Sequence, residues 1–486
     1  MFGMMPSRTE PLPVAPYLTP LIRPSRISAQ LRAQGRISLS EVLSALSCAL
    51  DLAEGAPAGH SMRTCLIGMR LAEAIGLDVE QRSALYYALL LKDAGCSSNA
   101  GRTAALFAAD DRAVKPHMKV VDWHARPRLA LEAARAVAPD RSFLDRAWQF
   151  VALARTPEAM RELIETRSDR GASIALQLGF PPRTADAIRS LDEHWCGRGH
   201  ARGLTGEEIP LLARIANLAQ TVETFHDRGG VEAVHRVVRE RAGRWFDPAL
   251  ARLVLDWSKD DPWWALLCGD VAGAVVAAEP SDRAIEVNDD GLDGVARVFA
   301  EIIDAKSPFT AGHSMRVAEM ARLIAKRCGL DGREQRRIYR AGLLHDVGTL
   351  GVSNLILDKD GPMTDEEREQ MEQHPRFTLD ILEHVPAFRG FARIAALHHE
   401  KLDGTGYPFG YTAEDLDLPE RILVVADIHD ALSSNRPYRQ AMVEPVITSI
   451  LERDRGTRLD PVALDALHAI RAERAEHATE TLATVE

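Results

Sequence analysis

The sequence predicts an all-α protein in which two helical bundle domains follow one another along the chain. Three observations predict this. Long stretches carry apolar residues at three- and four-residue steps, alternating strand-like segments are rare, and one set of motifs occurs twice in the same order. The helical stretches are rich in Ala, Leu, Arg and Glu, which favour helix. The clearest ones are residues 42–52, 64–75, 82–91, 315–324 and 421–432.

The internal repeat defines the domain layout. The motif "GHSMR" occurs at 59–63 and again at 312–316, and in each copy an Asp follows its histidine after 33 residues, within "LLKDAG" and "LLHDVG". A third block, "DEHWCGRGHARGLTGEEIPLLARI", aligns without gaps on "HEKLDGTGYPFGYTAEDLDLPERI". Three blocks in the same order indicate two copies of one domain.

We expect the first copy at residues 40–255, with an insertion of about 46 residues between its halves, and the second copy at 288–475. Residues 1–39 and 476–486 are predicted to be tails. Residues 256–287 are predicted to be a linker, although their Trp residues could instead pack the two copies together.

Composition excludes several classes of protein. The net charge of −11 gives no long-range attraction for polymeric nucleic acid. The six cysteines are scattered without a CxxC pair, which argues against a disulfide framework or a thiolate zinc site. No apolar run is long enough to cross a membrane, and the Pro- and Arg-rich N-terminus lacks the pattern of a signal peptide. We therefore expect a cytoplasmic protein without a membrane partner.

The second copy concentrates metal-binding residue types. Imidazole and carboxylate without thiolate suit iron, manganese or zinc. Adjacent ligands cannot share one buried helical stripe, but both can reach the same ions at a helix end. Asp346 is the candidate for a carboxylate that bridges two ions. His374 alone would suggest an ordinary core or surface histidine, and His384 and His429 are interpreted in that way. The predicted ligands are His313, His345, Asp346, His374, His398, His399 and Asp427.

Two nearby segments are candidates for substrate contacts. In "HHEKLDGTGYP", Gly406 permits a tight loop that would bring Tyr407 close to the ligands, although such loops are usually ordinary turns. In "SSNRPYRQ", Arg436 and Arg439 offer guanidinium forks suited to phosphate oxygens. The alternative is a capped, solvated start of a helix.

The segment from His313 to Arg439 resembles the HD-GYP family of bacterial phosphodiesterases. The resemblance rests on "GHSMRVA", "LLHDVG", "ILDKDGPMTDEEREQMEQHP", "HHEKLDGTGYP" and "RILVVADIHDALSSNRPYR". It implies a helical HD-type bundle with two or three metal ions, usually iron or manganese, and the seven residues above as ligands. It also implies hydrolysis of a cyclic dinucleotide, most often cyclic di-GMP to pGpG or GMP, while some members prefer mixed cyclic GMP-AMP and some are inactive.

Two departures from the family pattern matter. Thr349 occupies the position of the family's Lys beside the substrate phosphate, so we assign Thr349 to the substrate site and expect altered binding or rate. Phe309 replaces the Glu of members that hold a third metal, which favours two ions.

The first copy is predicted to be degenerate and non-catalytic, with a role in regulation, dimerisation or ligand sensing. His60 and Asp93 remain, but Lys92 and Gln220 replace two ligands, "HHE" has become 191–193 and "GTGYP" has become 197–201. Its partners would be a second copy of the chain or a signalling protein.

The predicted mechanism is attack on the phosphodiester by a hydroxide that bridges two metal ions. We assign the catalytic roles to Asp346 and His345, with the arginines stabilising charge on the phosphoryl oxygens. Two alternatives remain open: a weak or inactive cyclic-dinucleotide-binding signalling module, and an HD-type phosphatase acting on another nucleotide.

Overall fold

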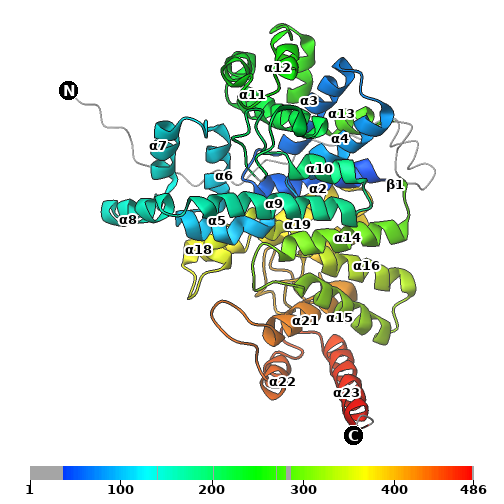
Figure 1. Cartoon of the computed structure of the whole chain (residues 1–486). Helices are drawn as coiled ribbons and strands as arrows, with labels where there is room; N and C mark the ends of the chain where they lie inside the picture. The colour runs from blue at the N-terminus through cyan, green and yellow to red at the C-terminus, as the bar shows by residue number, and fades with distance from the viewer. Residues whose placement is uncertain (1–36, 140, 201, 270, 281–285, 484–486) are drawn as a thin grey trace.

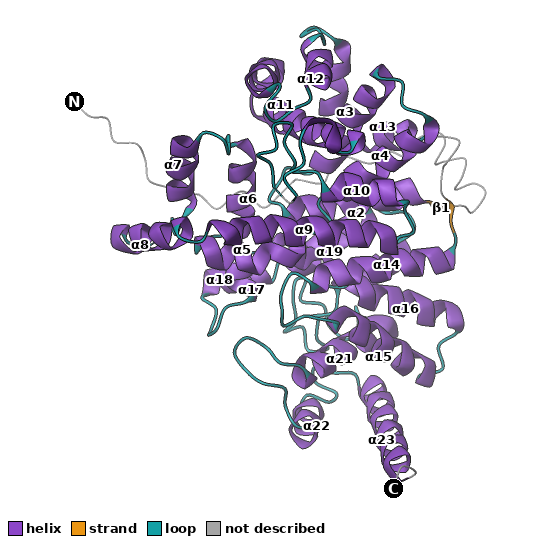
Figure 2. Cartoon of the chain, in the orientation of Figure 1, coloured by secondary structure: helices purple, strands orange, loops and turns teal. Residues whose placement is uncertain are grey.

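The computed structural model describes residues 37–139, 141–200, 202–269, 271–280 and 286–483, and it confirms the all-α class. Figure 2 shows helices and loops almost throughout. The named strands of the described residues are β1 (Ile37–Ser38) and β2 (Glu286–Val287), which pair antiparallel with Ile37 opposite Val287. This pairing joins the starts of the two copies. Most of the predicted N-terminal tail lies outside the described residues.

The first copy forms the upper part of the molecule in Figure 1, in blue to green. Its central helix α11 is interrupted at Gly229 and Gly230, whose backbone angles are not helical. The elements of this copy are α2 (Leu39–Ala53), α3 (His60–Ala74), α4 (Val79–Leu91), η1 (Cys96–Asn99), α9 (Pro157–Gln177), α10 (Pro182–Arg189), η2 (Gly206–Glu208), α11 (Leu211–Arg241) and α12 (Pro248–Leu255).

The predicted insertion forms a helical unit between η1 and α9. It has a small hydrophobic core of its own, which includes Phe107, Val114, Val137 and Leu153. In Figure 1 the last of its helices projects from the left side of the molecule. The unit comprises α5 (Ala100–Phe107), α6 (Asp111–Val120), α7 (Arg126–Ala136) and α8 (Phe143–Ala154).

The second copy repeats the same plan in the lower part of Figure 1. Its last helix continues to Ala483, so the predicted C-terminal tail from residue 476 begins as helix. The elements are α14 (Asp289–Asp304), α15 (His313–Arg327), α16 (Gly332–Leu344), η5 (Val347–Gly351), α17 (Asn354–Leu357), α18 (Asp365–Met371), α19 (His374–Glu383), α20 (Arg389–Ala396), α21 (Leu418–Ser433), α22 (Glu444–Arg453) and α23 (Pro461–Ala483).

The repeat extends to local backbone detail. Gly59 and Gly312 both adopt left-handed backbone, with φ of 81° and 69°, directly before the helices that begin at His60 and His313. The side chains of Asp78 and Asp331 cap the next helix of each copy by accepting a hydrogen bond from a backbone N–H three residues on. Because the equivalent helices begin at equivalent residues, matching side chains of the two copies lie at matching places in each bundle.

The segment predicted to be a linker is largely helical and packs on the first copy. It contains η3 (Pro262–Cys268) and α13 (Val271–Ala278), and α13 packs against α3 and α2. Trp257 and Trp264 are buried, and the Arg70 guanidinium lies 4.3 Å from the centre of the Trp257 ring. These Trp residues therefore extend the core of the first copy.

One hydrophobic core runs through both copies. Buried residues from α2, α3 and α11 belong to the same cluster as those from α14, α15 and α21. Helix α2 of the first copy packs against η5 and α19 of the second, and Arg170 forms an ion pair of 3.0 Å with Glu301. All six cysteines are free thiols. Within the described ranges, we find no helix with the length and apolarity that a membrane span requires.

The shared core predicts that the two copies unfold together. Calorimetry of the whole chain should give one cooperative transition, because separating the copies would expose α2 and η5 to water. Residues 288–486 expressed alone should melt at least about 4 °C below the whole chain, which corresponds to a loss of about 1 kcal/mol or more. Two well-separated transitions in the whole chain would contradict a continuous core.

Candidate metal centre

The seven predicted ligands of the second copy converge in one place. Six of them lie at or just beyond helix ends, where adjacent residues can point to the same spot: His313 begins α15, His345 and Asp346 follow α16, and His374 begins α19. His398 and His399 follow α20, and Asp427 lies within α21. Adjacent ligands were expected to lie at helix ends, and both adjacent pairs, His345–Asp346 and His398–His399, do so.

Asp346 lies between two groups of imidazoles. Its Oδ2 is 3.5 Å from His345 Nε2 and 3.8 Å from His313 Nε2. Its Oδ1 is 3.4 Å from His374 Nε2 and 3.6 Å from His398 Nε2. Each carboxylate oxygen thus faces its own pair of nitrogens, which is the arrangement that a carboxylate bridging two cations requires.

Asp427, on helix α21, lies close to histidines of both imidazole groups. Its Oδ1 is 3.3 Å from His313 Nε2 and 3.8 Å from His345 Nε2, and its Oδ2 is 3.8 Å from His399 Nδ1. The ligand atoms of His313, His345 and Asp427 lie within 4.8 Å of one another, and so do those of His374, His398 and His399. The residues therefore form two adjacent ligand sets that share Asp346.

Backbone carbonyls orient three of the imidazoles. His345 Nδ1 donates to Gly342 O at 2.8 Å, His374 Nδ1 to Met371 O at 2.7 Å, and His398 Nδ1 to Ala395 O at 2.7 Å. A carbonyl can only accept, so each Nδ1 carries the proton and each neutral ring keeps a lone pair on Nε2. Local backbone contacts thus direct three Nε2 lone pairs at Asp346 and at one another.

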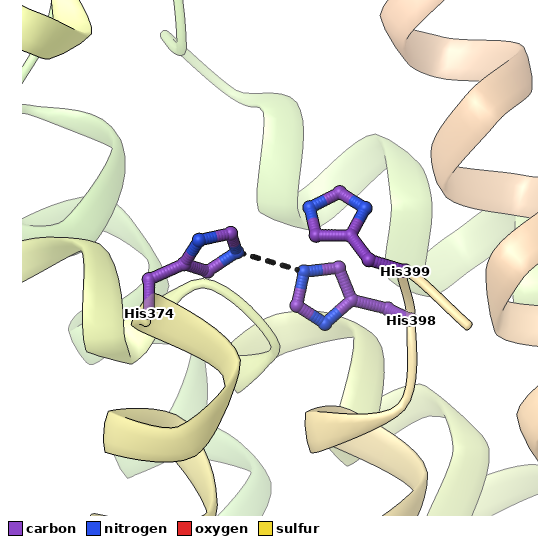
Figure 3. A group of neighbouring side chains, drawn as sticks. All are labelled: His374, His398 and His399. Carbon is purple, nitrogen blue, oxygen red and sulfur yellow. Dashed lines mark hydrogen bonds between the residues drawn. The ribbon is translucent and has the colours of Figure 1, made fainter. Parts of the chain in front are cut away.

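The group formed by His374, His398 and His399 lacks a positive charge. His374 Nε2 and His398 Nε2 face each other at 3.1 Å, as Figure 3 shows, and the third ring of that group, His399, lies beside them. The Nε2 of His345 is buried and makes no hydrogen bond to any described residue. Buried nitrogens of this kind are normally paired, so the donor set fits metal ions at this position.

The protonation states of His398, His399 and Asp346 agree with metal binding. Burial, reinforced by the neighbouring imidazoles, holds the pKa of His398 and that of His399 well below the usual range. Although burial would raise the pKa of the Asp346 carboxyl, the surrounding imidazoles lower it well below its usual value. Neutral rings and an ionised carboxylate are the forms that ligate borderline divalent cations.

A further residue, Asp430, was not identified from the sequence. Its Oδ2 accepts a hydrogen bond of 2.7 Å from His313 Nδ1, and Arg316 holds the same carboxylate through Nε at 2.7 Å and Nη2 at 3.0 Å. Although burial would lower the pKa of His313, hydrogen bonds to Asp427 and Asp430 raise it to about 10.

The first copy repeats this group, with Glu223 contacting His60 and Arg63. A carboxylate therefore recurs at the same aligned position in both copies. This recurrence could have identified Asp430 as a functional residue from the sequence.

The glycine-rich loop is fixed against the ligands. The buried Glu400 carboxylate accepts hydrogen bonds from the backbone N–H of Phe409 at 2.8 Å and of Tyr411 at 3.0 Å. A Cβ on Gly406 would lie 2.4 Å from the Glu400 Cα, so this position has room only for glycine. The loop brings the Tyr407 ring to 4.7 Å from the ring of His399. The substrate role predicted for Gly406 and Tyr407 stays a prediction, now with a position beside the metal ligands.

The other predicted substrate residues have structural contacts of their own. The Thr349 hydroxyl donates to the carbonyl of Asp346 at 2.7 Å. The Arg439 guanidinium donates to the backbone carbonyl of Ala431, in the last turn of α21, and at 3.0 Å to that of Gln440, which lies beyond the helix. Arg436 pairs with Arg439 through the backbone, with N–H to carbonyl distances of 2.8 Å and 3.1 Å. Their contacts with substrate remain predictions.

The equivalent position in the first copy holds basic side chains. Lys92 replaces His345 in the aligned sequence and contacts the Asp93 carboxylate. A Cβ on Gly95 would lie 1.9 Å from the Arg167 carbonyl, as a Cβ on Gly348 would from the His374 carbonyl. Arg167 therefore occupies the position of His374, and it contacts Asp192. The insertion between these blocks hid this equivalence in the sequence.

Comparisons with known proteins agree with this geometry. The family model described as "HD domain" matches residues 152–250 and 297–462, which together are more than half of the chain. The chain is 39% identical over 437 residues to the 3'3'-cGAMP-specific phosphodiesterase 3 of Vibrio cholerae, with 90% of this chain and 95% of that protein aligned. It is 36% identical over 179 residues to the cyclic di-GMP phosphodiesterase response regulator RpfG of Xanthomonas campestris, with 36% of this chain and 47% of that protein aligned.

Among solved structures, a cyclic GMP-AMP-specific phosphodiesterase of Vibrio cholerae matches with a TM-score of 0.62 and 35% identity, covering 90% of this chain and 98% of that one. The resemblance inferred from the motifs is therefore confirmed over both copies. The chain belongs to the HD domain family, in its HD-GYP branch of metal-dependent phosphohydrolases.

Proposed function

We propose that the second copy hydrolyses a phosphodiester bond of a cyclic dinucleotide. The observation that carries this proposal is the Asp346 carboxylate, which faces two separate pairs of imidazole nitrogens at 3.4–3.8 Å. Two divalent ions held there, iron or manganese by family resemblance, would supply Lewis acidity that activates water near neutral pH and stabilises charge on phosphorus. Phe309, whose phenyl ring cannot ligate, supports two ions rather than three.

The protein's own residues then have distinct tasks. The seven ligands hold the ions, and Asp430 with Arg316 keeps the His313 ring in one orientation. The Tyr407 ring lies 4.7 Å from the ring of His399, where it is suited to stacking on a base. Arg436 follows shortly after the end of α21, the helix that carries Asp427, and its guanidinium fork suits a phosphate oxygen.

The relatives favour one base composition. A relative that aligns with 90% of this chain is named for 3'3'-cGAMP, whereas the cyclic di-GMP phosphodiesterase of Xanthomonas campestris aligns with 36% of this chain. We therefore place mixed cyclic GMP-AMP before the cyclic di-GMP that the sequence alone suggested. Chromatography of the products from both cyclic dinucleotides tests this order, and faster hydrolysis of cyclic di-GMP would reverse it.

We further propose that the first copy is not catalytic. Lys92 and Arg167 stand at the positions of His345 and His374 and already contact Asp93 and Asp192. An ammonium and a guanidinium cannot ligate a cation, and their charge repels one. The cluster of Glu54, Asp93 and Cys96 could otherwise bind a metal, but Lys119 Nζ lies 2.7 Å from Glu54 and 3.8 Å from Asp93.

The first prediction concerns the bridging carboxylate. Asp346→Ala should lose both metal and phosphodiesterase activity, because two cations without a shared carboxylate repel each other at short range. Elemental analysis and product chromatography measure the two losses, and circular dichroism should show unchanged helicity. Near-native activity of this variant would contradict the assignment.

The second prediction concerns Asp430. Asp430→Asn should lower metal affinity or activity about 10–100-fold, as expected for a residue that orients a metal-bound imidazole. The matched control is Glu223→Gln, the same change at the equivalent position of the first copy, which should leave both properties unchanged. Equal losses in the two variants would indicate a general effect on folding instead.

The third prediction concerns the departure at Thr349. Thr349→Lys should accelerate hydrolysis of cyclic di-GMP by up to about 10²–10³-fold, because a cation beside the scissile phosphate stabilises developing charge. Thr349→Val, which removes the hydroxyl without adding charge, is the control. If the Lys variant gains nothing while the wild type hydrolyses cyclic GMP-AMP, the Thr instead marks a changed specificity.

A further inference from the structure

Helix α8, in the insertion of the first copy, exposes an apolar face. The helix projects from the left side of the molecule in Figure 1. Four of its large apolar side chains are exposed, with exposed fractions of 83% for Phe143, 78% for Leu144, 73% for Trp148 and 40% for Val151. Burial of apolar surface drives protein association, and aromatic residues are enriched in interfaces. The second copy has no such insertion, so this face is additional to the bundle that the two copies share.

Contacts on the opposite side of α8 fix its orientation. Leu153 is buried in the small hydrophobic core of the insertion, through which α8 packs against α5 and α7. The Gln149 side chain donates to the carbonyl of Leu106 in α5 at 2.9 Å, and the Arg146 guanidinium donates to the carbonyl of Ala134 in α7 at 3.2 Å. The helix is therefore held from its inner side, and its apolar outer face is directed away from the molecule.

The sequence of α8 is that of a helix with neighbours on both sides. Nine of its 12 residues are apolar. A helix that is apolar around its whole circumference is normally buried on all sides. On the outer face, Leu144, Ala147, Trp148 and Val151 are exposed and recur at three- and four-residue steps. This spacing forms a stripe along which a second helix can pack.

We propose that the protein forms a homodimer in which α8 packs antiparallel against α8 of a second molecule. A twofold axis between residues 147 and 148 places Leu144 opposite Val151 of the other molecule, and the large Trp148 opposite the small Ala147. A parallel pair would instead bring Trp148 against Trp148. The antiparallel pair also places Asp145 about 8 Å along the helix axis from Arg155 of the other molecule, on the same side of the pair, which an arginine side chain can span.

The apolar face is large enough for a reversible dimer. A large aromatic side chain buries about 150–250 Å² when it is fully covered. With the exposed fractions given above, the apolar faces of two molecules cover on the order of 1,000 Å² together, which is about the lower limit for a specific interface. The dimer is independent of the function proposed above. It assigns to the insertion the dimerisation that the sequence suggested as one role of the first copy.

Sedimentation velocity of the full-length protein tests whether the dimer exists. An interface near the lower size limit predicts a dissociation constant on the order of micromolar. A series from about 1 to about 200 µM protein therefore spans the expected change from monomer to dimer. A protein that sediments as a monomer throughout this range would overturn the proposal and would leave the apolar face to a partner of another kind.

Substitution locates the interface. Trp148→Glu should weaken dimerisation about thirtyfold or more, the loss typical of an aromatic hot spot in an interface. Because Trp148 is exposed in the single molecule, the helicity of this variant by circular dichroism should equal that of the wild type. The matched control is Val462→Glu, the same kind of change at an exposed apolar residue of α23, and it should dimerise normally. A Trp148→Glu protein that dimerises like the wild type would place the interface elsewhere and overturn the proposal.

Cysteine cross-linking tests the antiparallel pairing. Residue 147 lies beside the proposed twofold axis, so Ala147→Cys should form a disulfide-linked dimer when the full-length protein is oxidised with copper phenanthroline. Val151→Cys is the control, because the two residues 151 lie about 10 Å apart along the helix axes, beyond the reach of about 7 Å between the Cα atoms of a disulfide. The wild type, whose Cys196 and Cys268 are exposed, gives the background. Cross-linking of Val151→Cys but not of Ala147→Cys would overturn the proposed pairing.

Discussion

The organisation of the second copy depends on the Asp346 carboxylate and the imidazoles that face it. Five histidine ligands reach the site from helix ends, and three of their rings are oriented by carbonyls of their own chain segments. Burying so many nitrogen lone pairs and a carboxylate is unfavourable unless positive charge accompanies them. Metal ions would meet that requirement in the second copy, and lysine and arginine side chains meet it in the first. One electrostatic constraint thus explains both the similarity of the two copies and their divergence.

This divergence also explains why a degenerate copy is still folded. The His60–Glu223–Arg63 group survives although His60 has lost its neighbouring ligand His345, which is replaced by Lys92. The Glu223 carboxylate pairs with His60 Nδ1 and with Arg63 Nε, and this ion pairing supports the buried group without a metal, although the buried His60 Nε2 makes no hydrogen bond to any described residue. Where ligands such as His374 and His399 had no such partners, the first copy has Arg167 and Asp192, which pair with each other. The basic replacements therefore fill and pair the positions of His345 and His374, as our proposal of a non-catalytic first copy requires.

The sequence identified residues that converge in the structure, and there is a physical reason for this. Metal coordination needs particular side-chain types, so the seven ligands stand out as His and Asp at recurring motifs. Asp430 was missed because it acts through His313, and a single Asp on a helix has no distinctive pattern. Arg167 was missed because an insertion separates it from the aligned blocks. The helical state of residues 262–268 and 271–278 was missed because these short helices gain their stability from packing, η3 on α13 and α13 on α3 and α2, which local sequence does not reveal.

The relation between the copies could not be predicted from the repeat alone. Similar domains in tandem can be independent, but here α2 and α6 of the first copy contact η5 and the start of α17 in the second. That arrangement depends on the insertion, which the second copy lacks, and on side chains such as Arg112 that carry no motif. It makes the degenerate copy part of the surroundings of the catalytic turn.

We propose that metal ions occupy the second copy and that side-chain cations take their place in the first. Anomalous X-ray scattering from crystals of the full-length protein, recorded at the iron and manganese absorption edges, can locate such ions. We expect two neighbouring anomalous peaks on either side of the Asp346 carboxylate and no peak among Glu54, Asp93 and Cys96. A peak in the first copy, or a single peak remote from Asp346 in the second, would contradict it.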